Sequence, residues 1–144
     1  MLISDVLRRK GDFVATVAPD ATIRQLLSAL AEHNVGALVV TADGVRVAGI
    51  VSERDVVRSL QRGGAELLAQ PVSSIMTSEV KVAAPDESVE RLQELMTEQR
   101  IRHVPVVSEG RLTGIVSIGD VVASRMEQMT SERDSLIGYI SSAQ

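Results

Sequence analysis

The stretch Gly49-Ile50-Val51-Ser52-Glu53-Arg54-Asp55 decides the fold, because it recurs 65 positions later as Gly114-Ile115-Val116-Ser117-Ile118-Gly119-Asp120. A second match precedes it, since Ala-Pro-Asp-Ala-Thr-Ile at residues 18–23 corresponds to Ala-Pro-Asp-Glu-Ser-Val at 84–89. Agreement in the same order over both halves of a chain indicates an internal repeat. We therefore interpret the 144 residues as two copies of one structural unit.

Each copy predicts the order strand, helix, strand, strand, helix. Thr22 and Ser88 are residue types favoured as helix N-caps, and apolar residues at helical spacing follow each of them. These apolar stripes are Ile23, Leu26, Leu27 and Leu30 in the first copy and Val89, Leu92, Leu95 and Met96 in the second. Each stripe predicts a helix that buries one face.

Short apolar runs predict the strands. Residues 37–40 and 103–107 are typical of buried strands, and a glycine turn after each predicts a hairpin with a partner strand at 45–51 or 111–116. A copy of about 60 residues buries little surface alone, so we expect the two copies to pack about a pseudo-twofold axis. Residues 2–10 predict a short amphipathic helix that covers the first copy.

The composition excludes several classes of protein. Without cysteine, the chain has no disulfides, thiolate catalysis or cysteine-based zinc sites, and we predict no metal site. A net charge of −4 argues against nucleic-acid binding.

No apolar run approaches the roughly 20 residues of a membrane span, and residues 1–5 lack secretory-signal features, so we expect a cytoplasmic protein. Lys10-Gly11 is too short for a phosphate-binding P-loop, and no catalytic set is visible, so we predict no enzyme.

The repeated Gly-Ile-Val-Ser-x-x-Asp pattern resembles the signature of the cystathionine-β-synthase (CBS) domain, as do the two Ala-Pro-Asp openings, residues 102–107 and Ile75-Met76-Thr77. The resemblance covers residues 2 to about 126. It implies an α+β fold of two βαββα repeats that form one Bateman module. The expected divisions are repeat 1 with the N-terminal helix in residues 1–66, repeat 2 in 67–126 and a C-terminal helical tail in 127–144.

The resemblance also implies a function. Members of this family are regulatory, commonly dimerise, and bind AMP, ADP, ATP, NAD-type ligands or S-adenosylmethionine in clefts between the repeats. We therefore expect a stand-alone sensor that needs no cofactor, forms a homodimer and signals to an unidentified effector protein, with no nucleic-acid or membrane partner. The alternative is a ligand-free dimeric scaffold. The C-terminal tail is compatible with both the sensor and the scaffold. The spacing of its apolar residues favours a helix face that covers a neighbour or a dimer partner; these residues are Met126, Met129, Leu136 and Ile140.

Ser52 and Asp55, like Ser117 and Asp120, begin predicted helices. Free N–H groups and the macrodipole favour anions at a helix N-terminus. A hydroxyl there could bind a phosphate, and the carboxylate could accept two hydrogen bonds from a ribose diol. The same spacing is close to a capping box, and both roles can coexist.

In the family each cleft draws on both repeats. The resemblance therefore implies a first cleft of Ser52, Asp55, Lys81, Val82, Arg102, His103 and Pro105. It implies a second cleft of Ser117, Asp120, Thr16, Val17, Gly36 and Ala37, with Arg54 reaching in. Ile50 and Ile115 pack against adenine or in the core. Arg102 offers a fork of donors to phosphate and His103 a further donor, or else Arg102 is solvated and His103 is satisfied by backbone.

The clefts are expected to be unequal. The first repeat has Gly36-Ala37 where the second has Arg102-His103. The first cleft therefore holds more phosphate donors, and the second has a wall of small residues that could admit an adenine ring.

Overall fold

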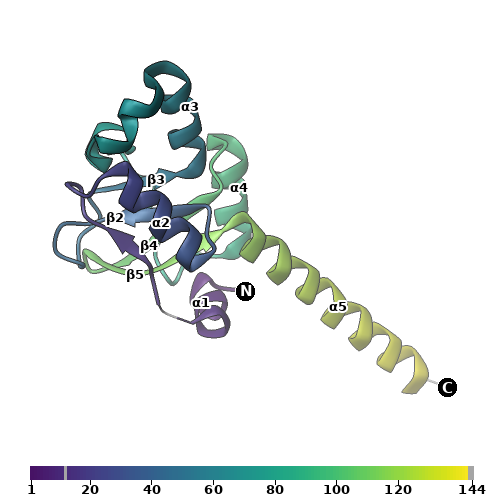
Figure 1. Ribbon diagram of the computed structural model, residues 1–144. Coiled ribbons are helices and arrows are strands. Elements are labelled where there is room, and N and C mark those ends of the chain that lie inside the picture. The colour runs from purple at the N-terminus through teal and green to yellow at the C-terminus, as the bar shows by residue number, and fades with distance from the viewer. Residues whose placement is uncertain (12, 143–144) are drawn as a thin grey trace.

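A computed structural model gives the structure of residues 1–11 and 13–142 (Figure 1). Within these residues the elements follow one another as α1 (Ile3–Lys10), β1 (Thr16–Val17), α2 (Ile23–His33), β2 (Ala37–Val40), β3 (Gly49–Ser52), α3 (Glu53–Gly63), the 3₁₀ helices η1 (Gly64–Ala69) and η2 (Val72–Ser74), α4 (Val89–Gln99), β4 (His103–Ser108), β5 (Arg111–Ser117) and α5 (Ile118–Ser142).

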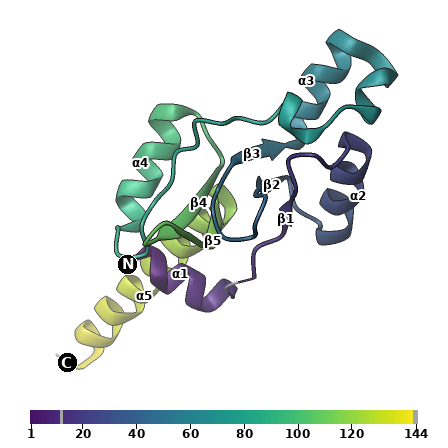
Figure 2. The same ribbon diagram turned by 90° about the vertical axis from the view of Figure 1, so that its left-hand side faces the viewer.

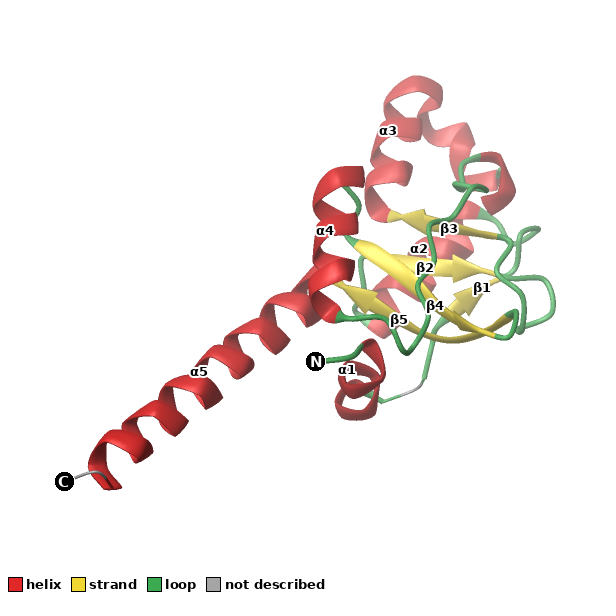
Figure 3. Ribbon diagram, turned by 180° about the vertical axis from the view of Figure 1, so that it is seen from behind, coloured by secondary structure: helices red, strands yellow, loops and turns green. Residues whose placement is uncertain are grey.

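Two small sheets lie at the centre of the molecule, with helices around them (Figure 3). In the first, β1 pairs parallel to β2 and β2 pairs antiparallel to β3. In the second, β4 and β5 form an antiparallel pair, and a single parallel bridge between Ala83 and Val106 stands where the first repeat has β1. The predicted α+β order is confirmed, although the first strand of the second repeat is reduced to this bridge.

The predicted caps and apolar stripes position α2 and α4. The hydroxyl of Thr22 accepts a hydrogen bond from the N–H of Gln25 (3.1 Å), and that of Ser88 accepts one from the N–H of Arg91 (3.2 Å). An N-cap of this kind satisfies a helix N–H that would otherwise lack a partner. The stripe residues Ile23, Leu26, Leu30, Val89, Leu92 and Met96 are buried.

The first hairpin differs from the prediction, because β3 begins at Gly49 and not at Val45. One carboxylate oxygen of Asp43 accepts hydrogen bonds from the N–H groups of Val45 (2.8 Å) and Arg46 (2.9 Å). Such an aspartate turn competes with strand pairing. In the second repeat Glu109 and Gly110 have φ of 52° and 76°, and the chain turns directly from β4 into β5.

Helix α1 packs on the second repeat, which corrects the prediction that it covers the first. Ile3 and Val6 are buried in one cluster with residues of α4, β4 and β5. Leu7 lies against the backbone of Gly114. An amphipathic pattern specifies that one face of a helix is buried but not which repeat buries it.

The linker between the repeats, which contains η1 and η2, packs on the first repeat, as α1 packs on the second. Its residues Leu67 and Val72 are buried in the core of the first repeat. The hydrogen bonds match in the two halves. The N–H of Ile3 donates to the carbonyl of Glu87 (2.9 Å), and the N–H of Val72 donates to the carbonyl of Ala21 (2.8 Å). Each repeat is thus completed by the segment that precedes the other repeat.

The C-terminal tail and the closing helix of the second repeat form one continuous helix, α5, which ends at Ser142. Residues 143–144 lie outside the described residues. All three ribbon views show α5 projecting away from the rest of the molecule (Figures 1, 2 and 3). Among the described residues no helix has the length and apolar character to cross a membrane.

The exchanged linker yields a prediction for Gly49→Ala. An added Cβ would lie 2.7 Å from Met76 Sδ and 2.8 Å from the carbonyl oxygen of Thr77, which is hydrogen-bonded to Ile50. We expect the free energy of unfolding, measured by urea denaturation, to fall by about 1–3 kcal/mol. Gly63→Ala is the matched control, because the space around Gly63 is open. Equal stability of the two variants would contradict the clamping of the linker against β3.

Candidate functional site

The two predicted Ser-x-x-Asp motifs lie where a strand passes into a helix. The N–H of Ser52 donates to Asp55 Oδ2 (2.8 Å), and the N–H of Asp55 donates to Ser52 Oγ (3.3 Å). Ser117 and Asp120 form the same pair at 2.8 and 3.1 Å. These bonds confirm the capping role. They occupy only Oδ2 of each carboxylate, so Oδ1 has capacity left for a ligand.

The two carboxylates differ in their surroundings, because the ammonium group of Lys10 reaches Asp120. Lys10 Nζ lies 2.6 Å from Asp120 Oδ2 and 2.7 Å from the carbonyl oxygen of Ile115. Among the ion pairs of the described residues, none involves Asp55. Burial raises the pKa of Asp120, but the hydrogen bonds from Lys10 and Ser117 outweigh it, so the net pKa is lowered. Lys10 therefore neutralises the carboxylate of the second motif, whereas no described residue pairs its charge with Asp55, although Oδ1 accepts no hydrogen bond from the described residues in either motif.

Lys10 has a counterpart in the first repeat that explains its position. There the carbonyl of Ile50 accepts a hydrogen bond from the N–H of Thr77 (2.9 Å), which belongs to the exchanged linker. The equivalent carbonyl of Ile115 has the ammonium of Lys10 instead. The same exchange thus places a neutral backbone group beside one motif and a cation beside the other.

His103 and Gly36 bring the two repeats together near these turns. A Cβ added to Gly36 would lie 3.7 Å from His103 Cε1 and 3.4 Å from Glu53 Oε1. The pKa of His103 is lowered, chiefly by burial and then by the charge of Lys10, although Asp120 and Glu53 oppose this. The imidazole is therefore neutral near pH 7, and a bound phosphate would be the kind of neighbour that favours its protonation.

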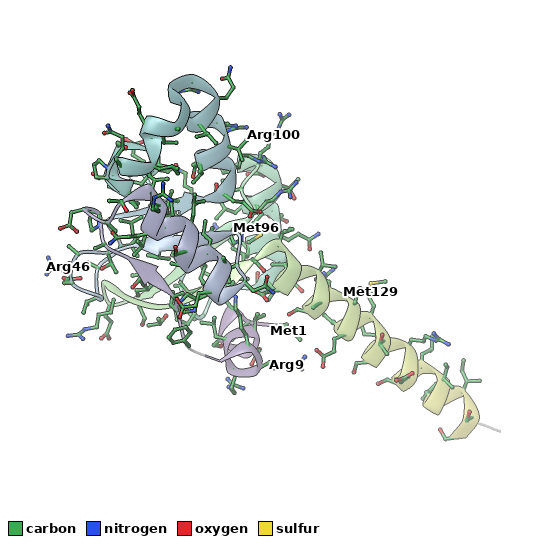
Figure 4. All side chains as sticks on the ribbon, viewed as in Figure 1. Met1, Arg9, Arg46, Met96, Arg100 and Met129 are labelled. Atoms are coloured by element: carbon green, nitrogen blue, oxygen red, sulfur yellow. The ribbon has the colours of Figure 1, made fainter. Side chains whose placement is uncertain are left out.

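Three arginines line one pocket of about 310 Å³ at the junction of the repeats. Arg54 comes from the start of α3, and Arg100 and Arg102 come from the turn between α4 and β4. Arg100 stands at the end of α4 (Figure 4). The other lining residues are Met96, Thr97, Ile101 and Ile118. With three guanidinium groups and no carboxylate in its lining, the pocket has the charge to hold phosphate.

This pocket brings together two residues, Arg54 and Arg102, that were predicted to lie in different clefts. Arg54 was predicted to reach into the second cleft and Arg102 to line the first, but both line the same pocket. The start of α3 and the start of β4 adjoin, as the proximity of Gly36 and His103 indicates, so a long arginine side chain from either repeat can reach the same space.

A larger hollow of about 430 Å³ lies between α4 and α5. Its lining is acidic, with Glu90, Glu94 and Glu98 on one face of α4. A phosphate-bearing ligand would meet like charge there. The larger volume of this hollow therefore does not make it the better candidate for a phosphate-bearing ligand; the charge of its lining favours the arginine pocket. Within the described residues no group of three or more histidine, aspartate or glutamate side chains is placed to hold a metal ion.

The remaining predicted site residues divide by burial. The side chains of Val17, Ala37 and Pro105 are buried in the core, so only their backbone could touch a ligand. Ile50 and Ile115 are half-buried in β3 and β5. Thr16, Lys81 and Val82 are exposed, and their place in a cleft stays a prediction.

Sequence reasoning missed Lys10 and Arg100. Lys10 was considered only as part of the Lys10-Gly11 turn. The one feature that could have indicated its role is its position at the end of an amphipathic helix, but the sequence does not show where that helix packs. Arg100 follows α4 with φ of 54°, a left-handed conformation that ends the helix. No motif marked either residue, because both reach the site through the packing of distant segments.

Comparison with known proteins identifies the family. The family model of the CBS domain matches residues 3–62 and 72–127. The mitochondrial CBS domain-containing protein CBSX3 of Arabidopsis thaliana is 38% identical over 146 residues, which cover 96% of this chain and 71% of that protein.

Solved structures agree with this. A CBS-domain containing protein of Agrobacterium tumefaciens has a TM-score of 0.83 at 45% identity, covering 86% of this chain and 92% of that one. A CBS domain protein of Pyrobaculum aerophilum complexed with AMP has 0.74 at 32%, covering 83% and 89%. The CBS domain pair of protein MJ0100, in complex with 5′-methylthioadenosine and S-adenosyl-L-methionine, has 0.79 at 25%, covering 89% and 98%. The duplicated turns, the exchanged packing and these matches lead to one conclusion: the chain belongs to the CBS domain family, as a tandem pair of CBS repeats.

Proposed function

We propose that this protein is a regulatory module that binds an adenine nucleotide, with its principal site at the first motif. One observation carries the proposal: the carboxylate of Asp55 is held by Ser52 at the start of α3, and no ion pair among the described residues involves it. The AMP-bound and S-adenosylmethionine-bound relatives support an adenine-containing ligand.

The chemistry of the site suits such a ligand. Oδ1 of Asp55 would accept hydrogen bonds from the ribose hydroxyls, as a carboxylate can accept at both oxygens. Arg54, Arg100 and Arg102 would supply forked donors to the phosphates. The chain has one Phe, one Tyr and no Trp, so the base would be held by aliphatic contact and backbone hydrogen bonds.

The second motif would bind a nucleotide more weakly, because Lys10 already neutralises Asp120 and contacts the carbonyl of Ile115, and a ligand that uses Oδ2 must displace it. Breaking a short charge-assisted pair that is half-buried opposes binding. Displacement would also release the end of α1. Occupancy of this motif could thus be transmitted to the N-terminal segment.

A ligand signals only if it binds two conformations with different affinity. We propose that the relative position of the repeats or of the dimer halves supplies these states, and that an effector protein in the cytoplasm responds to them. We propose no catalytic step. A ligand-free scaffold is the alternative, and absence of binding by every adenine nucleotide would favour it.

The Asp55→Asn variant tests the principal site. Asparagine keeps the shape and can still cap α3, but it loses a charge-assisted acceptor, which contributes about 1.5–3 kcal/mol. In calorimetric titrations with AMP or ATP we expect roughly 10- to 100-fold weaker binding. Asp120→Asn is the matched control and should leave the tighter binding event nearly unchanged. The proposal is wrong if Asp120→Asn abolishes that event and Asp55→Asn does not.

The Lys10→Met variant tests the closed second motif. Methionine retains the apolar stem of the side chain and removes the ammonium group, so the carboxylate of Asp120 becomes available. We expect calorimetry to show a second binding event, or at least about tenfold tighter binding at that motif. Arg8→Met is the control, because Arg8 forms only an exposed ion pair with Asp5 on the same helix. An unchanged titration for Lys10→Met would refute the blocking role.

The lowered pKa of His103 predicts a pH dependence of stability. The unfolded state binds a proton near pH 6.5 that the folded state resists, so stability falls as pH drops below about 6.5. His103→Gln should reduce this fall in thermal unfolding between about pH 7.5 and 5.5. In the wild type, saturating ATP should also reduce it, since a phosphate near His103 favours the protonated ring. Identical pH profiles for wild type and His103→Gln would contradict the assignment.

A further inference from the structure

None of the residues that the structure describes covers the outer part of α5. Every residue from Met129 to Ser142 is exposed, and Met129 stands on the projecting helix away from the two repeats (Figure 4). These 14 residues extend about 21 Å. A solvated helix of that length is marginal in water, and Gly138 and the β-branched Ile137 weaken it further. A helix of this kind is expected to be covered by another molecule.

One face of α5 carries a regular apolar stripe. Its members recur at alternating steps of four and three residues, which is the seam spacing of a coiled coil. They are Val122, Met126, Met129, Leu136 and Ile140, with exposed fractions of 50%, 63%, 65%, 60% and 53%, and Arg133 fills the one remaining seam position. The exposure of every apolar member indicates a surface made for contact, because isolated exposed residues would not keep this register.

We propose that this stripe binds the same stripe of a second copy of the chain, with the two α5 helices antiparallel and crossing at Ser131. The six seam positions are symmetric about residue 131. An antiparallel pair centred there places Val122 opposite the partner's Ile140, Met126 opposite the partner's Leu136, and Met129 opposite the partner's Arg133. Every seam position meets another, and no apolar member is left unpaired.

Charge selects the antiparallel direction. In a parallel pair Arg133 would face the partner's Arg133 inside the apolar seam, and desolvated like charges are unfavourable. In the antiparallel pair Arg133 lies opposite Met129 and within one turn of the partner's Glu132. Each arginine then has a carboxylate close by, and its apolar stem covers the methionine.

Other occupants fit the helix less well. A helix that lies on a membrane surface is typically rich in Lys and Arg on its polar face. Between Met129 and Ser142 the charged residues are Glu132, Arg133 and Asp134, which sum to one negative charge. A second copy of the chain matches the symmetry of the seam positions about residue 131, and its Glu132 can pair with Arg133. The inference goes beyond the proposed function, and its tests contain no nucleotide.

The first test is sedimentation velocity of the full chain over a range of concentrations, with Leu136→Glu compared with the matched control Ser135→Glu on another face of α5. Leu136→Glu should raise the dimer dissociation constant at least about tenfold, and Ser135→Glu should behave as wild type. Arg133→Leu should associate more tightly than wild type. A monomeric wild type, or a dimer that Leu136→Glu leaves intact, would overturn the proposal.

The second test measures direction. The chain has no cysteine, so Thr130→Cys and Ser141→Cys each accept a single spin label. In the antiparallel pair the two Thr130 positions lie about 3 Å apart along the helix axis and the two Ser141 positions about 30 Å apart. Electron–electron distances should therefore be much longer for Ser141 than for Thr130. Similar short distances at both positions would indicate a parallel pair, and no short distance at Thr130 would exclude pairing through α5.

Discussion

The exchange of packing segments between the two repeats is the constraint on which the rest of the structure depends. The chain before each repeat completes the core of the other, through backbone hydrogen bonds at Ile3 and Val72 and through close contacts at Gly49 and Gly114. This exchange makes the two repeats one body. It sets the starts of α3 and β4 side by side, which is where Arg54 and Arg102 converge.

The same exchange makes the two Ser-x-x-Asp motifs unequal. Both Ser-x-x-Asp turns form the same capping bonds, so local sequence alone gives them the same geometry. Their difference comes from the segment that packs beside each one, because α1 brings the ammonium of Lys10 to Asp120, whereas the linker brings the backbone N–H of Thr77 to the carbonyl of Ile50. A duplicated motif can in this way carry an unpaired carboxylate in one copy and a cation-paired one in the other.

Periodicity and duplication predicted the repeat, the caps at Thr22 and Ser88, the buried stripes and the two turns. They failed where distant packing decides the outcome. The pattern of residues 2–10 could not indicate which repeat covers α1, and nothing local marked Lys10 or Arg100. The first hairpin was misplaced because the side chain of Asp43 replaces backbone pairing.

The central claim is that a nucleotide binds first at the turn that begins α3. A titration with AMP, followed by the assigned backbone amide resonances, tests it most directly. The account predicts that the amides of Ser52 to Asp55 shift at lower ligand concentration than those of Ser117 to Asp120, because Lys10 already neutralises the carboxylate at the second turn. Shifts that begin at Ser117 to Asp120, or no shift at either turn, would contradict it.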